Sequence, residues 1–338
     1  MPDFSIAVDL GGTNLRIAAV STNGEMLEKV TLGTNLASGP DHVITEMCDA
    51  IVHLSGKYHG GGSFLGVGAG IPGILDLEAG KVSKSANLPG WSGYPVREEI
   101  ERRLGTHFFL DNDGNMAALG EQWRGAARDV PNMAMLTLGT GIGGALMLNG
   151  KIFHGMNGMA GEFGHVPIEP EGVPCGCGSH GCSERYASAT AVVRMAREAI
   201  ASGGATGLAK AANTDPEFGA KSVFNLAMQG DEDARRIFRR FGKALGMLLA
   251  GIVNGLNLEM YVIGGGVSSA WDAFAPAMFD ELRERSLIYA ATDPEAGSRR
   301  GTGSVAHVIS GRKTIVTRAL LGSDAGLYGA ARMPVVGI

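Results

Sequence analysis

The sequence has no apolar run near the roughly 20 residues that a membrane-spanning helix needs. Its most apolar stretch, 244–253, is interrupted by Gly246 and Gly251, and the residues before Phe4 do not resemble a signal peptide. There is no excess of basic residues either, because 29 Lys and Arg against 34 Asp and Glu give a formal net charge of −5. We therefore expect a cytoplasmic protein with neither membrane nor nucleic-acid partners.

Cysteine is also scarce, with 4 residues in 338. Three of the four form the pattern CxCGxxGC shortly after His165; they are Cys175, Cys177 and Cys182. Thiolate and imidazole are the ligands that tetrahedral zinc prefers, and three Cys with one His leave no position open for water. The pattern predicts a structural zinc site. The alternative, a disulfide or buried free thiols, is disfavoured because Cys175 and Cys177 are too close to bridge easily.

The remaining composition is that of a packed globular protein, with a hydrophobic share of 45% and a charged share of 19%. A length of 338 residues suggests two domains with a cleft between them. We expect a smaller α/β domain over 1–118, completed by a C-terminal helix at about 317–338. A larger α/β domain over 119–316 would carry the zinc-binding knuckle.

Hydrophobic periodicity indicates where strands and helices lie. Strands are expected at 5–8, 15–20, 25–32, 64–69, 108–110, 133–138, 145–148 and 260–263. Helices are expected at 41–57, 96–104, from near 115, within 189–258, and at 317–331 with a break at glycine.

Glycine, in contrast, is abundant, with 53 residues, and it clusters in turns that follow apolar strands. The turn 11–13 recurs as 139–144, and 264–266 follows a third strand. Such turns present successive N–H groups with no side chain in the way and can cradle phosphate, although each taken singly is better explained as a tight hairpin. Together they predict nucleotide binding, and no GxxxxGK[ST] motif of a P-loop is present.

The nucleotide would contact residues of all three turns. Asp9 is placed to hold Mg²⁺ through water, because hard cations prefer oxygen ligands. The other residues expected at the nucleotide are Gly11, Gly12, Thr13, Gly139, Thr140, Gly141, Gly264, Gly265 and Gly266.

Over nearly its whole length the chain resembles the ROK family of sugar kinases and repressors. The resemblance rests on 9–13 (DLGGT), 87–91 (NLPGW), 111–115 (DNDGN), 138–144 (LGTGIGG), 161–165 (GEFGH), 175–182 with Glu184, and 262–266 (VIGGG). It implies the actin-like, hexokinase-type ATPase fold, transfer of phosphate from ATP to a hexose with Mg²⁺, and a homodimer or homotetramer. One departure is Asn14, where many relatives have lysine; Arg16 is the nearest cation that could meet phosphate charge.

The resemblance also implies roles for individual residues. Asp113 would be the general base that accepts the proton of the sugar hydroxyl, although an N-cap role is the alternative for an Asp at a helix start. His165 would bind zinc through one ring nitrogen and a sugar hydroxyl through the other. The residues expected to hold the sugar are Asn87, Asn112, Asp113, Glu162, His165 and Glu184.

Three alternatives concern neighbouring side chains and the substrate. Glu162 and Glu184 could instead be solvated loop carboxylates, and Trp91 and Tyr94 could either stack on a sugar or pack beneath their loop. Residues 87–91 resemble the glucokinases of the family and favour glucose, whereas 111–115 and 177–182 also resemble N-acetylmannosamine kinases. N-acetylglucosamine is a further alternative.

Two alternatives belong to other classes of protein. A sugar-responsive repressor is disfavoured because no helix-turn-helix segment precedes Asp9, and a non-catalytic sugar-binding protein stays open.

Overall fold

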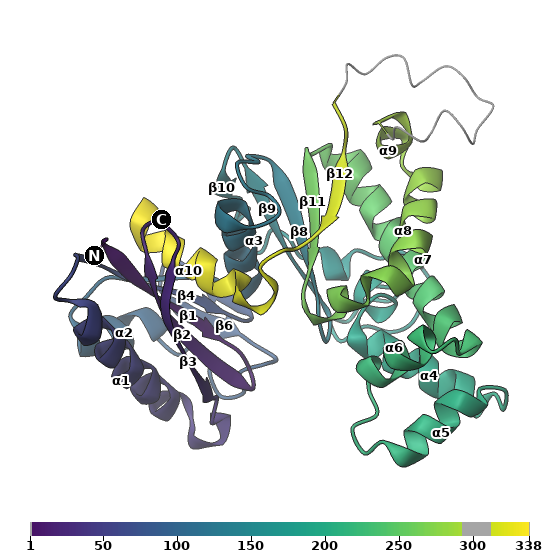
Figure 1. The fold of residues 1–338 in the computed structure, drawn as a ribbon, viewed down its shortest axis with the longest axis horizontal. Coiled ribbons are helices and arrows are strands. Elements are labelled where there is room, and N and C mark those ends of the chain that lie inside the picture. Colours follow the sequence, from purple (N-terminus) through teal and green to yellow (C-terminus); the bar gives the residue numbers. More distant parts are fainter. Residues whose placement is uncertain (1, 293–311, 338) are drawn as a thin grey trace. The chain divides into compact units, whose positions relative to one another are not determined.

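The computed structural model describes residues 2–292 and 312–337 and has a mixed α/β architecture (Figure 1). The first sheet has the order β3-β2-β1-β4-β7, the second the order β10-β9-β8-β11-β12, and β5 pairs with β6 in a small ribbon. The strands are β1 (Phe4–Leu10), β2 (Asn14–Ser21), β3 (Met26–Gly33), β4 (Phe64–Ile71), β5 (Ile74–Asp76), β6 (Lys81–Lys84), β7 (Phe108–Asn112), β8 (Met133–Leu138), β9 (Ile142–Leu148), β10 (Lys151–Ile152), β11 (Met260–Gly264) and β12 (Ile315–Arg318).

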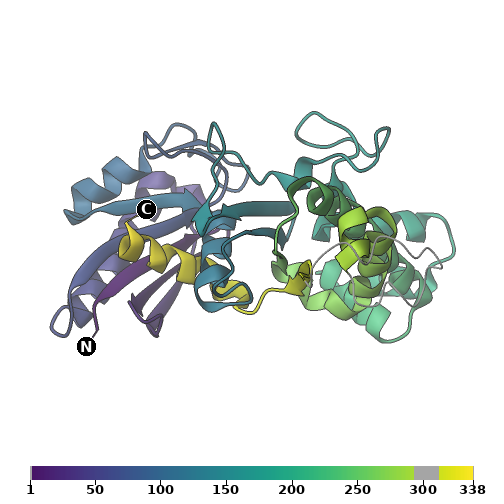
Figure 2. The same cartoon turned by 90° about the horizontal axis from the view of Figure 1, so that it is seen from above.

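Helices follow or separate these strands, and Figure 2 shows them from a second direction. They are α1 (Pro40–Tyr58), α2 (Val96–Leu104), α3 (Asp113–Arg124), α4 (Ala189–Ala201), α5 (Thr206–Thr214), α6 (Ala220–Met228), α7 (Glu232–Leu256), α8 (Trp271–Arg285), α9 (Leu287–Thr292) and α10 (Ala325–Val336). Short 3-10 turns are η1 (Leu36–Ser38), η2 (Phe163–His165), η3 (Ser183–Arg185), η4 (Gly266–Ala270) and η6 (Gly322–Asp324).

The chain divides into two compact units. The first comprises the described parts of Met1–Met135, Ala145–Gly161 and Ala319–Ile338, and the second those of Leu136–Gly144 and Glu162–Arg318. The division therefore crosses β8 and β9. Residues 293–311 of the expected larger domain and Ile338 of the expected C-terminal helix lie outside the described residues.

The two faces of the first sheet differ because side chains alternate along a strand. One face is large and apolar: Phe4, Ile6 and Val8 of β1 join α1 and α2 in a single buried core. On the other face, β1 and β4 carry small residues such as Ser5, Ala7 and Gly68, and Ser5 Oγ donates to the carbonyl of Ala331 in α10 at 2.7 Å. The first sheet is thus covered on both faces, with α10 supplied by the C-terminal end of the chain.

Glycine permits this close approach of α10. A Cβ at Gly68 would overlap the carbonyl of Ala330, and a Cβ at Gly329 would overlap the carbonyl of Met116 in α3. Both contacts are with backbone atoms, which cannot rotate away. The backbones of α3, α10 and β4 therefore meet without an intervening side-chain layer.

We expect Gly329→Ala to destabilise the protein by at least about 1–3 kcal/mol, the usual range for forcing a methyl group into a packed core. Gly251→Ala is the matched control, because Gly251 also lies within a helix but has open space at its Cβ position. That change should stabilise by about 0.5–1 kcal/mol, since alanine loses less entropy in a helix. Urea unfolding of both variants measures the contrast, and equal effects would contradict the packing argument.

Most predicted elements are confirmed: each expected strand overlaps an observed one, and α2 has the expected bounds. The helix expected from near 115 begins earlier, at Asp113. The helix expected at 317–331 is wrong in its first part, because Ile315–Arg318 forms β12 and pairs in parallel with β11. β-Branched residues in that run suit a strand. Gly326 and Gly329 do not break α10, because they lie where the helix packs closely.

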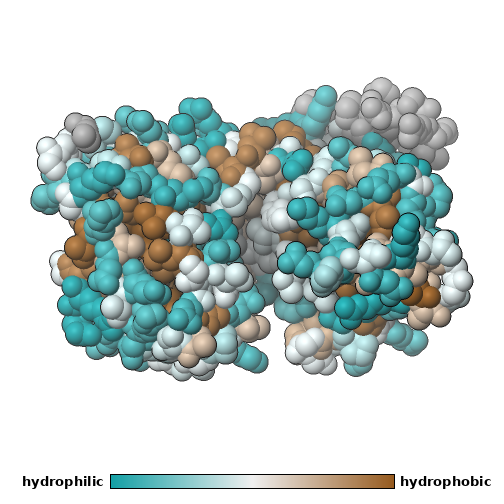
Figure 3. Space-filling view, turned by 60° about the horizontal axis from the view of Figure 1, so that its bottom comes forward, coloured by the Kyte–Doolittle hydropathy of each residue, from teal (hydrophilic) through white to brown (hydrophobic). Residues whose placement is uncertain are grey.

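In the described part of the chain, no helix has both the length and the apolar character to cross a bilayer. On the face drawn in Figure 3, hydrophobic side chains are interspersed among hydrophilic ones.

Candidate active site and metal centre

Acidic residues lie at the carboxyl ends of two strands, β1 and β7, which flank β4 in the first sheet. Asp9 of β1 pairs with Gly70 of β4, and Gly70 pairs with Asp111 of β7, all in parallel. Asp113 follows directly at the start of α3, and an ideal Cβ at Gly70 would lie 3.4 Å from its Cα. Parallel pairing therefore brings Asp9 and Asp113 to one edge of the sheet.

The first glycine turn lies at the same edge. Gly11 N–H donates to the carbonyl of Asn14 at 2.8 Å and closes the β1–β2 hairpin. An ideal Cβ at Gly12 would lie 3.1 Å from the carbonyl oxygen of Asn87. The turn and the segment of Asn87 therefore lie against each other, as a shared site requires.

Asp9 is held in a mixed electrostatic environment. Its carboxylate lies 3.4 Å from Arg16 Nη1, and its side chain is only 18% exposed. Burial raises the pKa of Asp9, Arg16 opposes that shift and Asp324 adds to it. The Arg16 guanidinium also donates to the carbonyl of Ser323, so it is bound to Asp9 and the C-terminal turn. A carboxylate with this burial fits a hard cation, which would favour its charged form.

The structure separates the roles of Asn112 and Asp113. Asn112 is the N-cap of α3, where its Oδ1 accepts from Gly114 N at 2.8 Å and its Nδ2 donates to the carbonyl of Gly73 at 3.0 Å. Asp113 is the first helical residue, and its Oδ1 accepts from Gly114 N at 2.9 Å. The alternative that Asp113 is the N-cap is therefore wrong, because the preceding residue has that position.

A contact between the buried Asp111 and the partly exposed His154 supports this helix start, and the sequence interpretation gave neither residue such a role. Asp111 is 4% exposed; its Oδ2 lies 2.7 Å from His154 Nε2, while its Oδ1 accepts from Asn115 Nδ2 at 2.8 Å. The contact with Asp111 raises the pKa of His154 and outweighs the effect of burial. The sequence signal that could have identified Asp111 is its place as a carboxylate at the end of a strand, just before a predicted helix.

Because the pKa of His154 is raised in the folded state, its protonated form stabilises the fold below about pH 6.5, the ordinary value. That contribution is lost as the pH rises through the raised pKa. We expect the difference in unfolding free energy between the wild type and His154→Gln to shrink from pH 6 to pH 8.5. Urea titrations at the two pH values test this, and an identical pH dependence in both proteins would contradict it.

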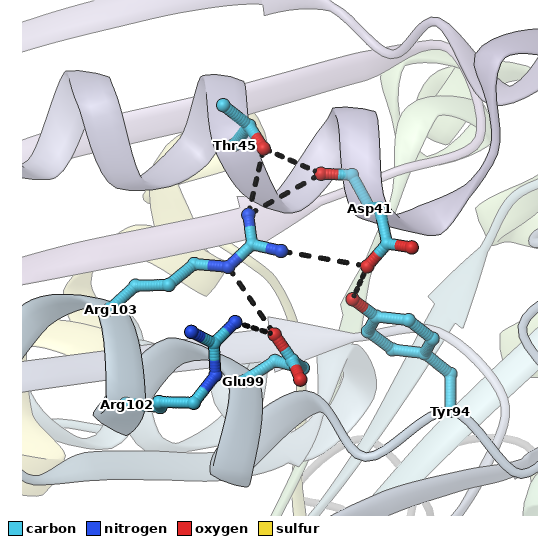
Figure 4. Close-up of polar contacts among 6 residues, drawn as sticks. All are labelled: Asp41, Thr45, Tyr94, Glu99, Arg102 and Arg103. Carbon is cyan, nitrogen blue, oxygen red and sulfur yellow. Dashed lines mark hydrogen bonds and ion pairs between the residues drawn. The ribbon is translucent and has the colours of Figure 1, made fainter.

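Packing of two aromatic side chains holds the segment after Asn87 in place. Trp91 is fully buried and its ring lies 5.4 Å from that of Tyr94, so the alternative in which both pack beneath the loop is confirmed. Figure 4 shows the Tyr94 hydroxyl donating to Asp41 Oδ1 at 2.7 Å. Burial raises the pKa of Tyr94. Arg103 in turn contacts Asp41, Thr45 and Glu99.

The other two glycine turns lie in the second unit, on adjacent strands. Gly139–Gly141 follows β8 and is closed by Gly139 N–H donating to the carbonyl of Gly141 at 3.0 Å. Gly264 ends β11 and Gly266 opens η4; Gly265 between them has φ +80° and packs on the backbone of Leu138. Two turns therefore converge at the ends of neighbouring strands.

A cavity of about 660 Å³ lies beside the second turn. It is lined by Thr140 and by the exposed side of α4, including Thr190, Arg194 and Arg197. Its position beside a glycine turn suits part of a nucleotide.

The predicted zinc ligands are gathered in the second unit, where the ligand atoms of His165, Cys175, Cys177 and Cys182 lie within 4.8 Å of one another. Cys177 Sγ is 3.7 Å from Cys182 Sγ, and Cys175 Sγ is 3.7 Å from His165 Nδ1. A tetrahedron with zinc–sulfur bonds of about 2.3 Å has edges of about 3.8 Å. The cluster thus fits a structural zinc ion, and His165 faces it through Nδ1.

Two carboxylates flank the cluster. Glu162 Oε2 lies 4.0 Å from His165 Nε2, and Glu184 Oε1 lies 3.8 Å from His165 Nδ1. Burial raises the pKa of the Cys175 thiol to about 12 and also raises that of Cys182. The backbone N–H of Ser179 lowers the pKa of Cys177. Zinc binding requires deprotonated thiols, so metal loading releases protons.

The expected site residues thus form two groups, one in each unit. The first unit holds Asp9, Gly11, Gly12, Thr13, Asn87, Asn112 and Asp113. The second holds Gly139, Thr140, Gly141, Glu162, His165, Cys175, Cys177, Cys182, Glu184, Gly264, Gly265 and Gly266.

The chain is similar in sequence and fold to known proteins. The sequence model of the ROK family matches residues 5–333. A glucokinase of Halalkalibacterium halodurans is 39% identical over 79% of this chain and 81% of its own. An N-acetyl-D-glucosamine kinase of Shigella flexneri is 32% identical over 82% of this chain and 87% of its own. The structure of a ROK family glucokinase from Streptomyces griseus in complex with glucose and AMPPNP has a TM-score of 0.77 at 29% identity and covers 98% of both chains.

The architecture is therefore the actin-like ATPase, or hexokinase, fold. Within that class, this chain belongs to the ROK family.

Proposed function

We propose that this protein transfers the γ-phosphoryl group of ATP to a hexose, converting glucose to glucose 6-phosphate. The observation that carries this function is the 39% identity to a glucokinase over four-fifths of both chains. It is supported by an acidic residue, Asp113, at the start of a helix beside the first glycine turn, and by a metal cluster beside the second.

In the proposed reaction, the sugar hydroxyl oxygen attacks the γ-phosphorus, the bond from that phosphorus to the bridging oxygen breaks, and ADP leaves. Asp113 accepts the hydroxyl proton, which is the main covalent assistance that phosphoryl transfer needs. The cap at Asn112 fixes the first turn of α3 and so orients this carboxylate. The pair of Asp111 and His154 holds the strand end from which α3 begins.

We propose that the sugar is held by amides and carboxylates whose oxygen and nitrogen atoms point in fixed directions. Asn87 and Asn112 would contribute from the first unit, although Asn112 already uses one donor and one acceptor within the protein. Glu162, His165 and Glu184 would contribute from beside the metal cluster. Zinc would hold these turns in shape and would take no part in the chemical step.

ATP would lie against the glycine turns, whose N–H groups suit its phosphates. Mg²⁺ neutralises phosphate charge when bound, and Asp9 is the carboxylate proposed to hold it through water. Arg16 is not proposed as a phosphate ligand, because Asp9 and the carbonyl of Ser323 already bind its guanidinium.

The test is ADP release, coupled to NADH oxidation, with ATP, Mg²⁺ and in turn glucose, mannose, fructose, N-acetylglucosamine and N-acetylmannosamine. The highest kcat/KM is expected with glucose. Silence with every sugar would contradict the proposal.

A second candidate, phosphorylation of N-acetylglucosamine, is supported by the 32% identity to a kinase named for that sugar. The same assay separates the two, because a preference for the N-acetylated sugar would keep the mechanism and change the substrate. We further propose that the protein acts in the cytoplasm as a homodimer or homotetramer, which sedimentation equilibrium would distinguish from a monomer.

A further inference from the structure

The carboxylate of Glu184 lies between the metal cluster and the second glycine turn. Its Oε1 is 3.2 Å from Cys175 Sγ. Its Oε2 occupies the space that a Cβ at Gly141 would need. Residue 141 lacks a side chain, and the Glu184 carboxylate fills that position from beside the ligand Cys182. One side chain therefore touches both a zinc ligand and the loop proposed to cradle phosphate.

Two further contacts join the ligand-bearing turns to the same loop. In η2, which ends at the ligand His165, a Cβ at Gly164 would overlap the carbonyl of Ile142. In η3, which follows the ligand Cys182, the buried Ser183 Oγ contacts the carbonyls of Phe163 and Gly164 at 2.9 and 3.0 Å. The two turns are thus bound to each other and rest on residues 141 and 142.

The segment that follows Glu184 also contacts the second glycine turn. Ala189 N–H donates to the carbonyl of Gly139 at 2.8 Å, and Thr190 Oγ1 donates to the carbonyl of Thr140 at 2.7 Å. The carbonyl oxygens of Gly139 and Thr140 are therefore hydrogen-bonded within the protein. Its position is therefore determined by the chain that runs from Cys182 through Glu184 into α4.

We propose that Glu184, in addition to its proposed contact with the sugar, is a positioning residue through which the zinc cluster sets the conformation of residues 139–143, so that zinc occupancy and binding of nucleotide phosphates are coupled. This rests on the proposed function only in naming the nucleotide. When zinc is lost, η2 and η3 are no longer tied together by their ligands, and the carboxylate that supports Gly141 moves with them. By linkage, a nucleotide that holds the loop also holds the cluster.

A matched pair of glycines in one loop tests the contact with the cluster. Neither Gly139 nor Gly141 has a positive φ, so alanine suits the backbone at both. Alanine at 141 displaces the Glu184 carboxylate, a flexible group that can move, whereas alanine at 139 meets open space. Zinc transfer to a chromophoric chelator should be about 10-fold or more faster for Gly141→Ala, as for other lost contacts around metal ligands. Gly139→Ala should release zinc at the wild-type rate; equal rates in both variants would overturn the proposal.

The second measurement uses the wild-type protein and a non-hydrolysable ATP analogue with Mg²⁺. A saturating analogue should slow zinc release, and zinc depletion should weaken its Kd, each by about 5-fold or more. Equal Kd values with and without zinc would overturn the coupling, while glucose phosphorylation by the same protein would leave the proposed function intact. If neither the zinc-bound nor the zinc-depleted protein binds the analogue, the proposed function fails, and the coupling to nucleotide fails with it. The comparison of Gly141→Ala with Gly139→Ala then decides alone whether Glu184 links the cluster to the loop.

Discussion

Replacing Asp113 by asparagine is expected to lower kcat for glucose phosphorylation by about 10²–10⁴-fold, the usual contribution of a general base. Asparagine keeps the oxygen that accepts from Gly114 N, so the helix start is preserved while the proton acceptor is lost. Steady-state kinetics with ATP and glucose measure the effect, and urea unfolding should give an unchanged free energy.

Asn112→Ala provides the contrasting control for that experiment. It removes the N-cap of α3 and should destabilise the protein by about 0.5–2 kcal/mol. Asp113→Asn should therefore lower turnover without lowering stability, whereas Asn112→Ala should lower stability and, because Asn112 is also proposed to hold the sugar, sugar affinity as well. A rate above about a tenth of wild type in Asp113→Asn would be too high for the loss of a general base and would refute that role.

Cys177→Ser is expected to cost the protein its zinc, and with it sugar affinity. A closed four-ligand site that loses one thiolate binds zinc far more weakly, and Glu162 and Glu184 are then no longer held by the cluster. Because displacement of substrate-positioning groups by about 1 Å can cost as much as 10²-fold, we expect the glucose KM to rise by about 10-fold or more. Metal analysis and kinetics of the same preparation measure both effects.

Cys177 is the suitable ligand to change because it is exposed, whereas Cys175 and Cys182 are buried and their replacement would also disturb packing. Cys48→Ala serves as the control, since Cys48 lies in α1 of the first unit and should leave the zinc content unaltered. Normal glucose KM in a zinc-free Cys177→Ser protein would show that the metal does not orient the sugar residues.

The zinc cluster could be predicted because its signal is local: three ligands lie close together in the chain, and their side-chain chemistry is specific to few roles. The glycine hairpin of β1 and β2 could be predicted for a similar reason, since apolar strands flank a turn that requires small residues. For Trp91 the sequence left two alternatives, and the one in which it packs beneath its loop is confirmed.

What the sequence could not reveal depends on contacts between distant segments. The expected helix at 317–331 began too early, at the last two residues of β12, because the strand that pairs with this segment, β11, is far away in the chain and local sequence does not reveal the pairing. The pair of His154 and Asp111 joins segments 43 residues apart, and neither residue stands in a pattern that names its partner. Gly141 looks like any phosphate-loop glycine until Glu184 is found in the place of its side chain.

The packing of α10 on β1 and β4 also bears on how the protein is made. The ribosome produces the first sheet early, yet the helix that covers its small-residue face comes last. At about 5–20 residues per second, that interval is on the order of tens of seconds. Throughout it, one face of the nascent sheet lacks its native cover, so the amino-terminal unit cannot finish folding before α10 has been made.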